Sequence, residues 1–274
     1  MTFPVYLHIL GHRIHPHLVM EIIAYSAGFQ LYRVTRRAFP RSRVNFEQNL
    51  WLIVGAVFGA LIGSKLLAWA ESFPDYWSHR SDPQIWLGGK TIVGGLLGGW
   101  AGVELAKRVL HIRHSTGDAF VFPLILGQCL GRVGCFLTGL DDHTHGNFTT
   151  APWAVNFGDG PRHPTQLYEI AFLLALGGLL WLVRRSSLSP GTPATQTVTA
   201  EGGGATPSLP NGALFRSYLL GYLLFRFFIE FLKPTWKPYL GLSGIQLASL
   251  VGAGCCVCQL LVVRRGVSVE PTTP

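Results

Sequence analysis

The amino-acid sequence predicts an all-α polytopic membrane protein with about seven transmembrane helices. Of its 274 residues, 49% are hydrophobic and only 13% are charged, and the mean hydropathy is +0.33. This composition leaves too little polar surface for an ordinary soluble domain. The apolar residues are also gathered into long runs, as a bilayer-spanning helix of roughly 20 residues requires. A lipid bilayer is therefore the expected solvent.

The apolar runs define the predicted helices in chain order. A weaker candidate comes first, at residues 17–32, and six clearer candidates follow at 50–70, 86–106, 118–140, 166–183, 214–232 and 240–263. The first ten residues lack the basic start and the small-residue cleavage site of a secretory signal. We therefore interpret residues 1–274 as a single membrane-embedded domain.

Two connecting segments have distinctive compositions. Residues 186–212 are dominated by Ser, Pro, Thr, Gly and Ala, which is typical of a flexible linker. Residues 141–165 instead mix aspartate, histidine, tryptophan and arginine with turn residues. The first segment is predicted to be a cytoplasmic linker without chemistry, and the second a functional loop on the outer side.

The basic residues indicate the orientation in the membrane. The net charge is +8, but the charges are spread by topology and form no single patch, so no nucleic-acid partner is expected. Most Lys and Arg residues lie in the loops after odd-numbered helices and near the C-terminus, as at 33–43, 107–113 and 184–185. The positive-inside rule then places the N-terminus outside and the C-terminus in the cytoplasm.

The five cysteines, Cys129, Cys135, Cys255, Cys256 and Cys258, lie within predicted helices. They are expected to pack as small apolar side chains and not to form disulfides. A metal cluster at the last three is disfavoured because no histidine or carboxylate accompanies them. No metal or organic cofactor is expected.

Glycines are concentrated in the third predicted helix. Small residues at such spacing allow helix backbones to approach closely in a membrane. A second interpretation is that Gly94 and Gly95 leave room for a substrate against bare backbone.

Several ionisable residues fall where hydrocarbon is expected. Each costs roughly 2.5–3.5 kcal/mol on insertion scales, so such residues indicate a functional site. By the helical rise of about 1.5 Å per residue, Arg132 and Arg226 share a depth in the outer half. Glu230 lies one turn from Arg226 at the i,i+4 spacing of an ion pair. Further charges in the outer half are Glu21, Lys65 and Lys90.

In the outer half, four cations therefore meet only two carboxylates, Glu21 and Glu230. This excess of positive charge predicts an anionic ligand, for which a phospholipid phosphate is the natural candidate. Arginine presents a planar fork that matches phosphate oxygens, and two forks from different helices can hold the group from two sides. The alternative is structural: Arg226 and Glu230 would form an internal ion pair, while Lys65 and Lys90 snorkel to the interface.

Three sequence strings carry a more specific signal. They are GRVGCF at 131–136, PRHPTQLYE at 161–169 and FRFFIEF at 225–231. In this order and spacing, over about residues 85–250, the chain resembles the prolipoprotein diacylglyceryl transferase family of the bacterial plasma (inner) membrane. The resemblance implies a multi-pass transferase whose active site faces the outer side.

The resemblance also implies a reaction and its participants. The diacylglyceryl group of phosphatidylglycerol, or of another anionic phospholipid, would move to the lipobox cysteine thiol in the signal peptide of an exported lipoprotein precursor. The family's phosphate-contacting arginines fall on Arg132 and Arg226, its sixth-helix carboxylate falls on Glu230, and a loop glycine corresponds to Gly146. Cations placed where the phosphate charge develops would lower the barrier.

The chain departs from the family at the residues of proton transfer. Val93 stands where the family has a histidine before two glycines, and Cys135 stands where it has an asparagine. The group that helps the thiol ionise is left open among candidates on the outer side: His143, His145, Asp142 and Lys90. His163 is interpreted first as an anchor for the outer loop, next to the expected phospholipid site.

Two alternatives to this reaction are kept. A divergent paralogue would use the same phospholipid site with another acceptor. A non-catalytic protein would bind or transport lipid and form no covalent product.

Overall fold

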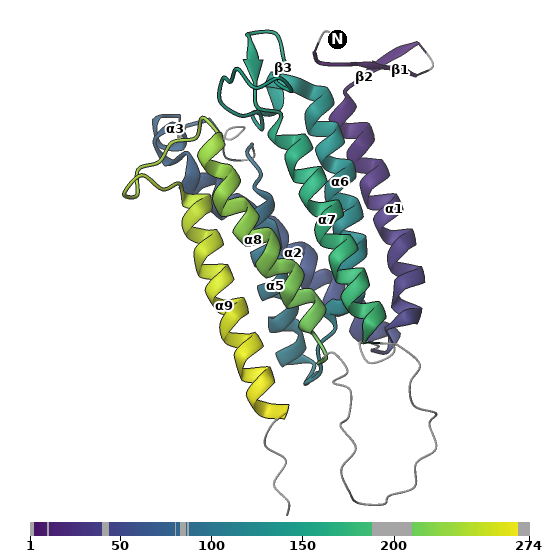
Figure 1. Ribbon diagram of the computed structural model, residues 1–274. Coiled ribbons are helices and arrows are strands. Elements are labelled where there is room, and N and C mark those ends of the chain that lie inside the picture. The colour runs from purple at the N-terminus through teal and green to yellow at the C-terminus, as the bar shows by residue number, and fades with distance from the viewer. Residues whose placement is uncertain are drawn as a thin grey trace, which may run out of the picture.

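The computed structural model describes residues 3–9, 11–39, 44–79, 81–82, 86, 88–187 and 210–267. Within these residues, seven helices of 17 residues or more pack side by side into one bundle (Figure 1). They are α1 (Pro16–Ala38), α2 (Phe46–Glu71), α5 (Ile92–Val109), α6 (Val121–Thr138), α7 (Thr165–Ser186), α8 (Ala213–Ile229) and α9 (Gly244–Val267). Each overlaps one of the seven apolar runs of the sequence.

Short elements close the two ends of the bundle. The helices are α3 (Phe73–Ser78), η2 (Gly117–Phe120), η3 (Gly139–Asp142) and η4 (Glu230–Leu232). Two antiparallel hairpins pair β1 (Leu7–Ile9) with β2 (His12–Ile14), and β3 (Val155–Asn156) with β4 (Pro161–Arg162). Both hairpins lie at the same end of the bundle as the start of α1 (Figure 1).

Four segments of the described chain are long and apolar enough to cross a membrane. They are Phe46–Glu71, Gly117–Asp142, Thr165–Ser186 and Gly244–Leu261. Many large apolar side chains of these helices are exposed, among them Phe58 and Leu61 of α2. Such a surface is stable in lipid and costly in water. The chain is accordingly an α-helical, multi-pass membrane protein.

Local sequence explains where several helices begin. Pro16 occupies the first turn of α1, where its missing N–H costs nothing. Asn45 and Gln48 form a reciprocal capping box at α2. The N-terminus of α8 is capped from a distance: the Asp118 carboxylate accepts hydrogen bonds from the backbone N–H groups of Gly212 (2.7 Å) and Phe215 (2.9 Å).

Glycines bring α2 and α5 into backbone contact. A Cβ atom added at Gly98 would overlap the carbonyl oxygen of Gly59, and one added at Gly94 would overlap that of Gly63. The same facing arrangement repeats one turn further along the two helices. The interpretation of the third-helix glycines as a packing surface is confirmed, because only hydrogen side chains permit this approach.

The core lies where α5, α6, α7, α8 and α9 meet. Leu173, Tyr218, Leu219 and Tyr222 are completely buried there, and Val93 is 1% exposed. Val93 therefore belongs to the packed interior.

Two predictions from sequence need comment. The third helix was expected to begin at residue 86, but α5 begins at Ile92. Gly89 adopts a positive φ of 62°, which ends regular helix geometry before Lys90. Lys90 thus precedes the helix and does not lie one turn inside it. The predicted linker at 186–212 lies largely outside the described residues.

Candidate active site

Two arginines from different helices meet in the interior. Arg132 of α6 and Arg226 of α8 are each 4% exposed. Both contact one carboxylate, Glu169 of α7: Arg132 Nε lies 2.9 Å from Glu169 Oε2, and Arg226 Nη1 lies 3.4 Å from the same oxygen. The sequence prediction that the two guanidinium groups converge at one depth agrees with this geometry.

The predicted i,i+4 partnership is also present. Arg226 Nη2 donates a hydrogen bond of 3.0 Å to Glu230 Oε2, and Glu230 is completely buried. The predicted excess of positive charge was counted without Glu169. Glu169 supplies the second negative charge, so two cations face two anions. Sequence reasoning missed Glu169 as a partner of the arginines, although a carboxylate near the start of an apolar helix was itself a signal.

Further polar groups surround this ion cluster. The Tyr222 hydroxyl donates to Glu169 Oε1 at 2.7 Å. Three atoms of the cluster, Arg132 Nε, Arg226 Nε and Glu230 Oε1, are buried without a hydrogen-bond partner within the described part of the chain, although Arg132 Nε lies at ion-pair distance from Glu169. Lys233 follows in the loop after η4 and is 6% exposed. Burial, with the two nearby guanidinium groups, lowers the pKa of Lys233 to about 7.

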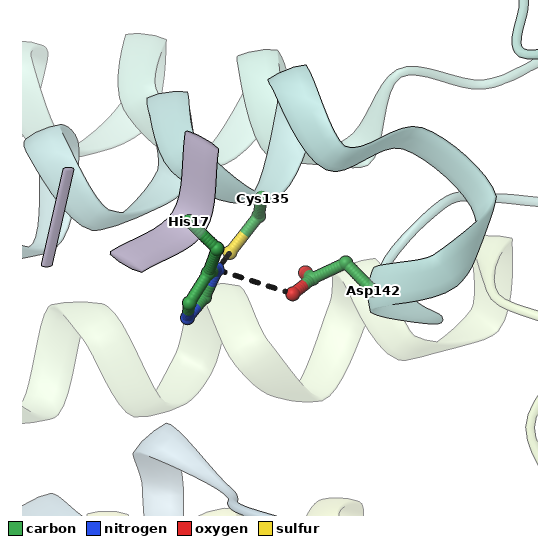
Figure 2. A group of neighbouring side chains, drawn as sticks. All are labelled: His17, Cys135 and Asp142. Atoms are coloured by element: carbon green, nitrogen blue, oxygen red, sulfur yellow. Dashed lines mark hydrogen bonds and ion pairs between the residues drawn. The ribbon is translucent and has the colours of Figure 1, made fainter. Parts of the chain in front are cut away.

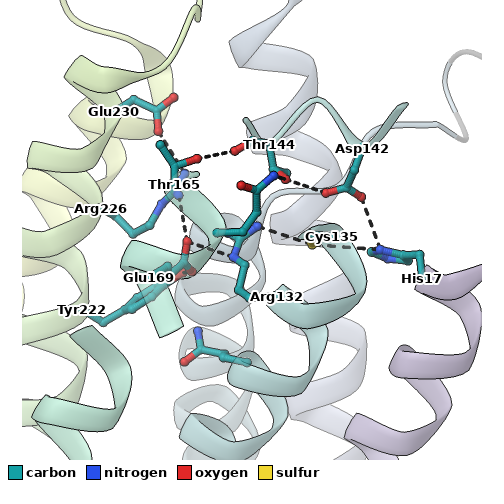
Figure 3. Close-up of polar contacts among 12 residues, drawn as sticks. His17, Arg132, Cys135, Asp142, Thr144, Thr165, Glu169, Tyr222, Arg226 and Glu230 are labelled. Atoms are coloured by element: carbon teal, nitrogen blue, oxygen red, sulfur yellow. Dashed lines mark hydrogen bonds and ion pairs between the residues drawn. The ribbon is translucent and has the colours of Figure 1, made fainter. Parts of the chain in front are cut away.

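A second polar group consists of His17, Cys135 and Asp142 (Figure 2), and it adjoins Arg132 on its other side (Figure 3). His17 Nδ1 lies 3.3 Å from Asp142 Oδ1. The Cys135 sulfur lies 4.0 Å from His17 Nδ1 and receives a 3.7 Å contact from Arg132 Nη1. Thr144 Oγ1 donates to Asp142 Oδ2 at 2.7 Å. Sequence analysis did not single out His17, because its partners come from the far end of α6 and from η3.

The two groups form one continuous polar chain across the bundle (Figure 3). It runs from Glu230 of α8 through Arg226 to Glu169 of α7, and on to Arg132 of α6. From Arg132 it continues through Cys135 and His17 to Asp142, as described above.

An elongated cavity of about 780 Å³ opens beside this chain. Arg132 and Cys135 line it from α6, and His17 lines it from α1, with Asp142 at the same end. Most other lining residues are apolar. From His17 to Tyr32 the cavity follows α1 for about 22 Å at 1.5 Å per residue. Arg226 does not line it, so of the two arginines Arg132 is the one presented to a ligand here.

The remaining predicted charges are Lys90, Glu21 and Lys65. Lys90 Nζ is 3.8 Å from Glu21 Oε1, and its side chain is 72% exposed. Both residues line the cavity. Lys65 of α2 donates to the backbone carbonyls of Gly88 (2.7 Å) and Gly89 (3.0 Å), so its ammonium group fixes the segment before α5. None of the three contacts the arginine cluster.

The two glycines predicted to contact phospholipid have different surroundings. Gly94 is buried against α2, which gives it a packing role. A Cβ atom at Gly95 would make ordinary contacts of 3.9 Å with Ala60 and Ser64. Neither glycine lines the cavity, although both belong to the helix that begins beside it. Contact of these glycines with a substrate stays a prediction.

The loop at 141–165, predicted to face the outer side, is held by backbone and ring contacts. Gly146 N–H donates to His163 O, and a Cβ atom at Gly146 would lie 2.6 Å from the Cβ of His163. His163 Nδ1 is 3.1 Å from the Tyr168 hydroxyl. Arg162 pairs with Asp159, which lowers the pKa of that exposed carboxyl. These contacts agree with the interpretation of His163 as a loop anchor.

The two loop histidines differ in exposure. His143 is exposed and adopts a positive φ of 52°. His145 is half-buried, and burial lowers its pKa, as does the nearby Arg162. Neither lines the cavity. Their assistance to a thiol stays a prediction.

One group of side chains has the geometry of a metal site. The donor atoms of His17, Cys135 and Asp142 lie within 4.8 Å of one another. This nitrogen, sulfur and oxygen set suits zinc. The Arg132 guanidinium next to the sulfur opposes it, because it places a fixed positive charge beside the ion.

The fold and site define a multi-pass helical membrane protein with buried arginines beside a largely apolar cavity. Comparison with known families shows which family within this class the chain belongs to. The pattern of the prolipoprotein diacylglyceryl transferase family matches residues 4–264. The chain belongs to this family.

Similar proteins cover most of the chain. A phosphatidylglycerol–prolipoprotein diacylglyceryl transferase of Pseudoalteromonas atlantica is 30% identical, over 93% of this chain and 88% of its own. A protein of the same name from Nitratidesulfovibrio vulgaris is 31% identical, over 92% and 90%. One from Coxiella burnetii is 32% identical, over 84% and 80%. The family resemblance inferred from the three sequence strings is confirmed.

Proposed function

We propose that this protein is a phosphatidylglycerol–prolipoprotein diacylglyceryl transferase. It moves the diacylglyceryl group of phosphatidylglycerol onto the lipobox cysteine thiol of a lipoprotein precursor. The thiol sulfur forms a bond to the glycerol carbon, and the carbon–oxygen bond to phosphate breaks. The leaving group is glycerol phosphate, and the thiol proton passes to a base.

The observation that carries this proposal is the position of Arg132. Its guanidinium group lies at the cavity and is held from behind by the Glu169 carboxylate. A guanidinium fixed in a water-poor site stabilises negative charge that develops on phosphate oxygens. The cavity follows α1 for about 22 Å, which exceeds the hydrocarbon depth of one leaflet, about 15 Å. It therefore suits a lipid whose headgroup meets Arg132.

Arg226 and Glu230 support Arg132 from the far side of Glu169. In this proposal they set the charge and position of that carboxylate. Glu230 orients Arg226 through their 3.0 Å hydrogen bond. Catalysis thus uses Arg132 directly and Arg226 with Glu230 through the network.

We place all seven long helices across the bacterial plasma membrane. The N-terminus and the loop at 141–165 then face outward, and the C-terminus and the 186–212 segment face the cytoplasm. The whole of 1–274 acts as one membrane-embedded transferase domain. Its partners are phosphatidylglycerol, the precursor's signal peptide and the surrounding bilayer.

Complementation tests the activity. The protein would be expressed in bacteria depleted of their own enzyme, and lipidation of a lipobox reporter would be followed by mass spectrometry. Thioether-linked diacylglyceryl on the reporter cysteine is the expected product, and Arg132→Ala should abolish it. Absence of product with well-expressed protein would remove this function.

Val93 favours keeping a second candidate. The histidine of the family pattern is missing at this buried position, so a paralogue could use the same phospholipid with another acceptor. Labelled phosphatidylglycerol, followed to product without a chosen acceptor, separates the two. If lipid binds and no covalent product forms, the protein is a lipid-binding or transport protein.

A further inference from the structure

The proton acceptor of the reaction has no assigned residue in this chain. At the third-helix position of the family's histidine, Val93 is 1% exposed and packs among apolar side chains. No titratable group can act from there. A different group at the cavity has to receive the proton of the attacking thiol.

His17 has the geometry of such a group. Its Nδ1 faces the Asp142 carboxylate at 3.3 Å, and its Nε2 lies on the opposite side of the ring, away from Asp142 and Cys135 (Figure 2). A carboxylate on one imidazole nitrogen fixes the ring and leaves the other nitrogen as the base. Thr144 holds Asp142 in turn, with a 2.7 Å hydrogen bond.

His17 is also next to the proposed phosphate site. The Cys135 sulfur contacts both Arg132 Nη1 (3.7 Å) and His17 Nδ1 (4.0 Å), so one side chain separates the guanidinium from the imidazole. His17 and Arg132 line the same cavity. The side chain of His17 is 35% exposed, which leaves it accessible to a substrate.

Other titratable side chains along the cavity are engaged elsewhere. Glu21 accepts a hydrogen bond from the Tyr25 hydroxyl and pairs with Lys90. The Tyr32 hydroxyl donates to Asn49, near the opposite end of α1. Of the described residues that line the cavity, His17 is the only histidine.

We propose that His17 is the general base for the substrate thiol and that Asp142 positions it. This assignment rests on the proposed function. The thiol proton passes to His17 Nε2 as the sulfur bonds to the glycerol carbon. The electron pair of the broken carbon–oxygen bond stays on the phosphate oxygen beside Arg132. The imidazolium that forms is stabilised by Asp142 and later releases its proton to water.

Kinetics of purified variants test this assignment. The assay combines phosphatidylglycerol in mixed micelles with a synthetic lipobox peptide carrying one cysteine, and it quantifies thioether product by mass spectrometry. His17→Asn should lower kcat about 10²–10⁴-fold, as loss of a general base does. KM for phosphatidylglycerol should stay within about twofold. His114→Asn, an exposed histidine at the opposite end of the bundle, is the matched control.

A rise in pH provides a readout that a structural role would not give. A free thiol ionises near pKa 8.5, so the deficit of His17→Asn should shrink between pH 7 and pH 9. Asp142 and Cys135 lie beside the imidazole, and the charged residues Arg132 and Glu21 line the same cavity. All four are the same in the variant. Asp142→Asn should lower kcat less than His17→Asn does, because the base itself remains.

The outcomes separate this inference from the proposed function. If the unaltered protein makes no thioether, the transferase function fails. If it makes thioether and a folded His17→Asn or His17→Gln variant keeps its kcat, only the assignment of His17 fails. Loss of kcat on chelation of metals, restored by zinc, would also overturn it, since His17 would then be a ligand. A loss confined to His145→Asn would move the base to the outer loop.

Discussion

Glu169→Gln should destabilise the protein strongly. The substitution preserves the shape of the side chain and an acceptor for the Tyr222 hydroxyl, so it removes mainly the charge. In the native cluster, two guanidinium groups face two carboxylates, with contacts of 2.9 and 3.4 Å to Glu169. The variant leaves one buried positive charge without a partner. Breaking a buried ion pair in this way costs about 3–5 kcal/mol.

Denaturant unfolding in lipid–detergent micelles, followed by tryptophan fluorescence, measures this cost. A double variant, Glu169→Gln with Arg132→Gln, restores the balance of charge and keeps the Arg226–Glu230 pair. It should be more stable than the sum of the two single effects by at least about 1 kcal/mol. Asp159→Asn, which breaks an exposed ion pair in the outer loop, should have a far smaller effect. Equal losses for Glu169→Gln and Asp159→Asn, or strict additivity of the double variant, would refute the reasoning.

Three further predictions concern helix packing, pH dependence and capping. Gly98→Ala should destabilise the protein by about 1–3 kcal/mol because the new methyl group overlaps the Gly59 carbonyl, whereas Gly254→Ala, with open space around it, should change the unfolding midpoint little. The folded pKa of Lys233 is lowered to about 7, so the unfolded chain binds more protons above that pH. The free energy of unfolding should therefore rise between pH 7 and pH 9, and a Lys233→Met variant, measured by the same denaturant titration, should lack that part of the rise. Asp118→Ala should lower the free energy of unfolding by about 1–2 kcal/mol through loss of the α8 cap, with Asp118→Asn less affected; equal effects of the two would contradict a capping role.

Sequence reasoning placed the helices well because apolar run length and helical rise are local properties. The shared depth of Arg132 and Arg226 followed from counting residues along two helices. The choice of Glu169 as their common partner did not follow, since it depends on how α7 is rotated against α6 and α8. Such rotation is set by packing of the whole bundle, which no single segment encodes.

The start of α5 and the role of His17 were missed for related reasons. Hydropathy alone extends the third apolar run back to residue 86, while the positive φ of Gly89 interrupts helical geometry and α5 begins only at Ile92. His17 stands near the start of the weakest apolar run. Its importance becomes visible only once Cys135 and Asp142 are brought against it by the packing of α1 on α6.

The capping of α8 by Asp118 has a practical consequence for protein engineering. The first N–H groups of α8 are bound by η2, and Ile245 N–H at the start of α9 is bound by the Glu71 carboxylate at 2.9 Å. Both helices thus take their starting points from earlier parts of the chain. A chain cut between Ser187 and Pro210 would retain these docking contacts. Two co-expressed fragments, the second beginning near Pro210, should therefore reassemble in the membrane and could report on assembly in living cells.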